Sequence, residues 1–170
     1  MKTEKRQQKA EKMNTARIGI NWKVLVVSFL VVFLVAYLGS LFTSTTVNSE
    51  WYDSIRPKLT PPSYVFPIVW NILFILIALS LYLLWVKADK NGRKNVAFAF
   101  GINFLLNILW SVLYFGLKNP KLAFFELIFL WLSIITMILV AKKIDKKAAW
   151  LLVPYLLWVS FASVLNFLSF

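Results

Sequence analysis

The 170-residue chain contains no cysteine and no histidine. These two absences exclude disulfide bonds, thiol nucleophiles, Cys/His zinc sites and Ser-His-Asp triads. They also remove the usual axial ligands of haem iron. The chain has no GxxxxGK[ST] loop, no GxGxxG fingerprint and no paired-acid metal motif. Hydrolytic, kinase or metal-dependent chemistry is therefore not expected.

Charge is scarce as well. Charged residues make up 15% of the chain and hydrophobic residues 60%, whereas a soluble domain is about 25% charged. A helix needs roughly 20 apolar residues to cross a bilayer. The windows of that length are 24–49, 59–86, 95–117, 122–141 (broken only by Glu126) and 148–170. The sequence predicts an all-α membrane protein, a bundle of five transmembrane helices at about 24–43, 63–86, 95–117, 122–141 and 148–169.

The positive charges are unevenly divided between the two sides of such a bundle. Segments 1–23, 87–94 and 142–147 hold fifteen Lys and Arg residues, and the alternate segments hold four. Lys and Arg are enriched in cytoplasmic loops. The N-terminus is therefore predicted to be cytoplasmic and the C-terminus outside. We expect a multi-pass protein of the bacterial or archaeal cell membrane.

Residues 1–22 form a basic tail, followed by a single transmembrane domain at 23–170. The net charge of +12 suggests anionic lipid head groups near this tail rather than nucleic acid. The tail has too few apolar residues for an amphipathic anchor. The run 24–42 is longer than the apolar core of a signal peptide, about 7–15 residues, so we expect a retained first helix.

The connection between the first two helices, at about 44–62, is much longer than the others. It contains the prolines Pro57, Pro61 and Pro62. Because a loop this long in a compact domain is usually functional, we expect a lid on the outer side. Pro67 falls near the start of the second helix, either in its first turn or at a bend. Pro154 is expected to kink the fifth helix.

Polar and aromatic residues share faces on three of the predicted helices. Since polar groups that face lipid are costly, these faces should point into the bundle. The three stripes are Asn103, Asn107, Trp110 and Tyr114; Tyr155, Trp158, Ala162 and Asn166; and Pro67, Trp70, Asn71, Phe74 and Ala78. Together they predict an aromatic pocket for a flat apolar ligand. The alternative for each asparagine is a structural hydrogen bond between helices.

Two further features of the predicted spanning helices, an acidic residue and a pair of small residues, lead to predictions. Glu126 is the one acid within a span, and we expect it to pair with a nearby Lys, Tyr or Asn rather than to relay protons. Ala97 and Gly101 form a small-xxx-small pair that faces away from the stripe on the third helix. This pair predicts a homodimer interface, the alternative being contact with another helix of the same subunit.

The stretch 51–70, WYDSIRPKLTPPSYVFPIVW, resembles the WY-x4-KP-x-W-x-PP-x-W-x-FGPVW region of the TspO/MBR family. The resemblance continues through NILWSVLYFG and LAFFELIFLW and ends in PYLLWVSFASVLNF, in the order and spacing of the family. The family comprises the tryptophan-rich sensory proteins of bacteria and the mitochondrial translocator protein, also called the peripheral-type benzodiazepine receptor.

The resemblance implies a five-helix bundle, usually a homodimer in bacteria, with a cavity closed by the lid. Members bind porphyrins and other tetrapyrroles, and animal members bind cholesterol and drug-like ligands. We therefore expect a membrane receptor or binding protein for porphyrin or haem, with a sensory or regulatory role and no required cofactor. The candidate ligand-binding residues are Trp51, Tyr52, Phe66, Trp70, Asn71, Asn107, Trp110, Phe129, Tyr155, Trp158, Ala162, Leu165 and Asn166.

Two alternative functions follow from the same resemblance. One is a transporter of porphyrins or lipids. The other is a light-dependent porphyrin-degrading enzyme that uses Trp70 and Trp158, although catalysis is not the favoured expectation. The chain departs from the family pattern at Leu59, Tyr64 and Pro67, so ligand selectivity does not carry over. The animal sterol motif is missing after LN, which makes a sterol ligand less expected.

Overall fold

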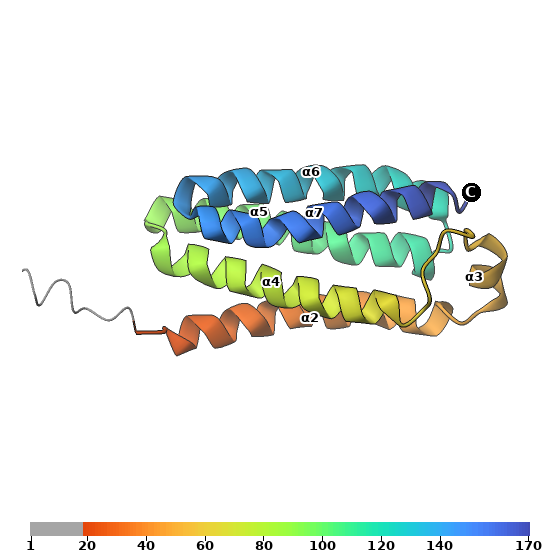
Figure 1. Ribbon diagram of the computed structural model, residues 1–170, viewed down its shortest axis with the longest axis horizontal. Coiled ribbons are helices and arrows are strands. Elements are labelled where there is room, and N and C mark those ends of the chain that lie inside the picture. The colour runs from red at the N-terminus through yellow and green to blue at the C-terminus, as the bar shows by residue number, and fades with distance from the viewer. Residues whose placement is uncertain (1–18) are drawn as a thin grey trace, which may run out of the picture.

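The computed structural model describes residues 19–170 (Figure 1). Five helical segments in it are long and apolar enough to cross a membrane. They are α2 (Trp22–Thr46), α4 (Val65–Lys87), α5 (Lys90–Ser111) with the π-helical turn η1 (Val112–Gly116), α6 (Pro120–Ile144) and α7 (Lys146–Phe167). A short helix, α3 (Glu50–Ile55), lies between α2 and α4, and the described residues include no strand. The predicted all-α bundle of five spanning helices is confirmed.

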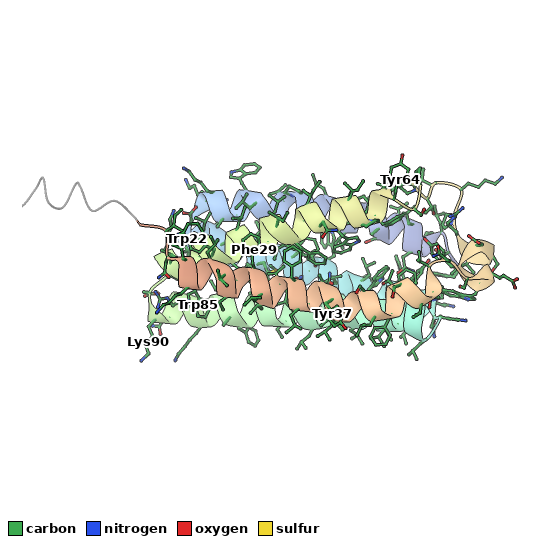
Figure 2. All side chains as sticks on the ribbon, turned by 90° about the horizontal axis from the view of Figure 1, so that it is seen from below. Trp22, Phe29, Tyr37, Tyr64, Trp85 and Lys90 are labelled. Carbon is green, nitrogen blue, oxygen red and sulfur yellow. The ribbon has the colours of Figure 1, made fainter. Side chains whose placement is uncertain are left out.

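The two ends of the described chain lie at opposite ends of the bundle. The start of α2 is at one end and the C-terminus at the other (Figure 1), as an odd number of crossings requires. Of the predicted basic tail, residues 1–18 lie outside the described part of the chain. Trp22, Trp85 and Lys90 lie at the end where α2 begins, and Tyr64 lies toward the other end (Figure 2).

Polar side chains cap the starts of four spans, where the first backbone N–H groups have no partner within the helix. The capping residues are Asn21, Asp89, Asn119 and Asp145. The fifth start, that of α4, has no side-chain cap. Pro67 is the third residue of α4 and so occupies the first turn, where its missing N–H removes no helical hydrogen bond.

The helices enclose a large apolar core, and a smaller apolar cluster lies where the lid meets η1. The helix α7 packs on α6 and α4, α5 packs on α6, and α2 packs on α4 and α5. The large side chains buried at the centre are Ile77, Leu84, Phe100, Leu127, Ile134, Met137, Leu152 and Tyr155. The outer faces are also apolar, as α2 shows with exposed Leu30, Leu34 and Tyr37. Both faces of these helices are apolar because the outer one contacts lipid rather than water.

The lid contains a helix that the sequence did not predict. Ser49 caps α3 by accepting a hydrogen bond from the Tyr52 backbone N–H at 3.3 Å. The ring of Trp51 lies edge-on to Tyr114, with centroids 6.1 Å apart, and Tyr52 lies 5.8 Å from Phe115. The first half of the lid is therefore docked on η1, at the junction of α5 and α6.

Candidate functional site

A groove runs between α4 and α7. Its volume is about 410 Å³, and it is lined by Val69, Ile72, Leu73, Pro154, Leu157, Trp158 and Phe161. Because Ile72 and Leu157 are exposed on the outer surface, the groove opens toward the membrane. The helix α7 continues unbroken through Pro154, which itself lines the groove. The feature is an apolar hollow in the lipid-facing side of the bundle, with Trp158 and Phe161 as its aromatic residues.

Trp158 is the one groove residue with a polar atom in its side chain. Its ring lies edge-on to Phe66 at 5.8 Å and tilted against Phe161 at 5.6 Å. The indole Nε1 is buried and has no hydrogen-bond partner within the described chain. Such an orphaned donor is costly, because burial removes the water that would otherwise satisfy it. A ligand that supplies an acceptor would remove that cost.

Trp70 lies on the α4 side of the same helix pair. Its ring stacks on Phe74 with centroids 5.3 Å apart, and it meets Tyr155 of α7 edge-on at 6.2 Å. Trp70 therefore packs with Phe74 and Tyr155, whereas Trp158 packs with Phe66 and Phe161. Both groups combine residues of α4 and α7, and of the two tryptophans only Trp158 lines the groove.

The asparagines of α5 are occupied by hydrogen bonds to neighbouring helices. Asn103, with no exposed surface, donates to Ser133 Oγ of α6 at 2.8 Å and accepts from the Tyr155 hydroxyl of α7 at 3.3 Å. Asn107 donates to that hydroxyl at 3.1 Å. The structure thus shows the alternative considered for these residues, a polar network that joins α5, α6 and α7.

Two other predicted site residues pair with each other. Trp110 Nε1 donates to Asn166 Oδ1 at 3.0 Å, and Asn166 Nδ2 donates to the Pro120 carbonyl at 2.7 Å. Ala162 and Leu165 lie on the same helix as Asn166, half-buried and buried respectively. None of these residues lines the groove; the hydrogen bonds join α5, α7 and the start of α6.

Two predicted site residues lie on the outside of the bundle. Asn71 is exposed, and its amide donates to the Pro67 carbonyl of its own helix at 2.8 Å. The expectation that its side chain points into the bundle is wrong, because this local bond satisfies the amide without a partner helix. Phe129 is an exposed residue on the outer face of α6, away from the groove between α4 and α7.

The expected partner of Glu126 is absent. The side chain is buried, and neither carboxylate oxygen has a hydrogen-bond partner among residues 19–170. The prediction of a pair with Lys, Tyr or Asn is therefore wrong. The nearby cations Lys118 and Lys121 are exposed, because long side chains at a helix end extend toward water.

Trp51 and Tyr52 lie at the lid's contact with η1 and not at the groove. The Lys118 ammonium lies 5.9 Å from the centre of the Trp51 ring, a cation–π geometry. Burial raises the pKa of the Tyr52 phenol, so this ring stays neutral where it packs. The role of these two residues is to anchor the lid.

The groove includes residues that sequence reasoning missed. Val69, Ile72, Leu73, Leu157 and Phe161 line it, but each is an ordinary apolar residue of a spanning helix. The available signal was Pro154, a proline within a helix beside Trp158. The described residues contain no cluster of acids that could hold a metal ion.

The predicted dimer interface on α5, formed by Ala97 and Gly101, is open in the structure. A Cβ atom added at Gly101 would meet no atom of another described helix within 4 Å, and Ala97 is exposed. The alternative, packing of Gly101 against another helix of the same subunit, is therefore wrong. The small-residue pair is open on the surface of α5, and the dimer itself remains a prediction.

The family model described as "TspO/MBR family" matches residues 27–169. The chain belongs to the TspO/MBR family. The matched range includes all of the α4–α7 groove and the lid. The family assignment made from the tryptophan-rich motifs is thus confirmed by an independent comparison over most of the chain.

Curated relatives extend from archaea to animals. The chain is 39% identical over 144 residues to "Tryptophan-rich protein TspO" of Archaeoglobus fulgidus, covering 84% of this chain and 92% of the relative. It is 37% identical over 134 residues to the protein of the same name from Chlorobaculum tepidum, covering 78% and 85%. It is 29% identical over 122 residues to "Translocator protein" of Ovis aries, covering 69% and 72%.

Proposed function

We propose that this protein is a membrane receptor for tetrapyrroles and related flat apolar molecules, with porphyrin or haem as ligand and a sensory or regulatory role. The observation that carries the proposal is the aromatic groove between α4 and α7, with the unpartnered indole nitrogen of Trp158 beside it. Its volume of about 410 Å³ falls within the roughly 300–1,000 Å³ usual for small-molecule sites.

The residues of the groove favour a flat ligand whose faces contact apolar and aromatic side chains and whose edge accepts a hydrogen bond. Trp158 and Phe161 supply aromatic contacts, while the other lining residues are aliphatic apart from Pro154. No histidine is present to coordinate haem iron, so a free-base porphyrin suits this site better than one that needs an axial ligand. A carboxylate or carbonyl oxygen of the ligand would accept from the indole N–H of Trp158.

The proposal places the protein in the cell membrane of a bacterium or archaeon, with a cytoplasmic N-terminus. The support is the excess of Lys and Arg at one end of the bundle. That end includes Lys87, Lys90, Lys142 and Lys146 at the starts or ends of spans. Anionic lipid head groups are the expected partners of this surface.

The proposal is tested by titrating the protein, reconstituted in lipid nanodiscs, with free-base porphyrin and following tryptophan fluorescence. The double variant Trp70→Ala/Trp158→Ala should lose at least about ten-fold in affinity, equivalent to about 1.4 kcal/mol. Trp22→Ala is the matched control, because Trp22 is exposed at the start of α2, a helix that contributes no residue to the groove lining. Unchanged affinity in the double variant would rule out this site.

The same preparation separates binding from the two alternatives. Porphyrin flux across proteoliposomes that depends on the protein would favour a transporter. Chemical products that form only under illumination would favour the degrading enzyme. Saturable binding without flux or products is the outcome expected of a receptor.

A further inference from the structure

The second half of the lid presents apolar side chains outward. Leu59 is 58% exposed and Tyr64 is 66% exposed. Pro62 and Ser63, which lie between them, are exposed too. Isolated exposed apolar residues need no special explanation. The position of Tyr64, however, is set by α4, which begins at the next residue.

Tyr64 continues the lipid-facing row of α4. Its backbone is already right-handed helical, so Tyr64, Ile68, Ile72 and Ile75, at i, i+4, i+8 and i+11, share one face. All four side chains are exposed. The three isoleucines belong to a segment able to span the membrane, so their face contacts lipid tails. Tyr64 marks the level at which this face leaves the apolar interior of the bilayer.

The location and chemistry of the segment match a membrane–water interface. Figure 2 shows the Tyr64 side chain directed away from the bundle, and Trp22 and Trp85 at the opposite end. Trp and Tyr are enriched at both interfaces of a bilayer. Lys58, next to Leu59, is exposed and provides a cation of the kind that lipid phosphates attract.

We propose that residues 58–64 are a membrane-contact surface whose partner is the phospholipid leaflet at this end of the bundle. Leu59 and Tyr64 insert among the head groups and the first part of the acyl chains, and Lys58 pairs with lipid phosphate. The lid is thus held at two places, with α3 docked on η1 and the 58–64 segment resting in lipid.

This arrangement also bears on how a ligand reaches the groove. Ile72 belongs both to the lipid-facing row that begins at Tyr64 and to the lining of the groove. The lid segment therefore lies about two helical turns along the same face from the groove. A ligand dissolved in the leaflet reaches the groove from the lipid without passing through water. This consequence rests on the proposed function, whereas the lipid contact does not.

The absence of cysteine from the chain allows a direct test with single nitroxide labels. The labels are placed by Leu59→Cys and Tyr64→Cys in full-length protein, in vesicles of phosphatidylcholine and phosphatidylglycerol without ligand. Phe129→Cys, on the exposed face of α6, is the lipid control. Asp53→Cys, on the exposed side of α3, is the water control. Collisions with oxygen, which concentrates in lipid, are compared with collisions with a water-soluble nickel chelate.

Labels at positions 59 and 64 should collide several-fold more with oxygen than with nickel, as at position 129, whereas position 53 should show the reverse. Nickel accessibility equal to that at position 53 would overturn the proposal, because the segment would then lie in water. Low collision with both reagents would also overturn it, because protein would then cover the segment. No tetrapyrrole is present, so a failure of tetrapyrrole binding does not alter this result.

Discussion

Trp110 on α5 and Asn166 on α7 are joined by a hydrogen bond of 3.0 Å from the indole nitrogen to the amide oxygen. The amide nitrogen of Asn166 in turn donates to the carbonyl oxygen of Pro120 at 2.7 Å. One side chain therefore connects α5, α6 and α7 at the end of the bundle where the lid docks.

Removing this connection should loosen the bundle. Asn166→Ala leaves the Trp110 N–H and the Pro120 carbonyl without their partner, and we expect a loss of about 1–2 kcal/mol in the free energy of unfolding, near the upper end for hydrogen bonds in membrane proteins. Unfolding experiments in mixed micelles measure this loss in the free energy of unfolding. Asn71→Ala, which removes an exposed amide bonded only to its own helix, should change stability little. Equal losses in both variants would contradict this account.

The indole of Trp158 should contribute in two separable ways. Trp158→Phe keeps an aromatic face and should weaken porphyrin binding modestly. Trp158→Ala removes the face, and a stacked ring contributes on the order of 1–3 kcal/mol by analogy with base–aromatic stacking. Fluorescence titration in nanodiscs gives both affinities. If Phe and Ala cost the same, the ligand depends on the indole N–H rather than on stacking.

Light provides an independent check on the enzymatic alternative. Photodegradation through tryptophan needs the oxidisable indole, so Phe at both Trp70 and Trp158 should abolish it even where binding survives. Absorbance of bound porphyrin under illumination follows the reaction. Bleaching at the same rate in wild type and in the double Phe variant would remove these residues from any photochemistry.

The open face of α5 should mediate self-association. Ala97→Leu with Gly101→Leu adds bulk where helices would otherwise approach closely, and it should shift the protein toward monomer in detergent. Because a Cβ atom added at Gly101 would meet no atom of another helix within 4 Å, porphyrin binding should persist. Cross-linking measures the oligomeric state. The control is Thr136→Leu, at an exposed position on α6. An unchanged dimer would place the interface elsewhere.

Asp145 should stabilise the α6–α7 junction mainly as a helix cap. Its carboxylate accepts from the backbone N–H groups of Lys147 at 2.6 Å and Ala148 at 3.1 Å, and it also pairs with Lys87. Asp145→Ala should cost about 1–2 kcal/mol through the lost cap. Lys87→Met should cost less than about 1 kcal/mol, because this ammonium is partly exposed and screened. Equal losses in unfolding experiments would mean that the ion pair dominates.

The sequence was sufficient to predict the five spanning helices. Uncharged runs of about 20 residues must be helical in a bilayer, because no water is present to satisfy the backbone. Helix-capping residues such as Asn119 and Asp145 mark where the spanning helices α6 and α7 begin. The tryptophan-rich motifs were specific enough for the family. Helix α3 was missed because a six-residue helix depends on docking, here of Tyr52 on Phe115, rather than on its own periodicity.

Only the tertiary structure decided which side chains meet. Periodicity places Asn103 and Asn107 on one face of a helix, and it places Asn71 near Trp70, but it does not say what each face contacts. In a soluble protein a polar outer face would mark the orientation of each helix. Here lipid and core are both apolar, so that signal is nearly absent, and rotation about each helix axis is set by packing and by hydrogen bonds between helices. For this reason Asn71 and Phe129 face outward, and Glu126 is buried with no hydrogen-bond partner among residues 19–170. For the same reason most of the groove lining consists of apolar residues that the sequence did not distinguish.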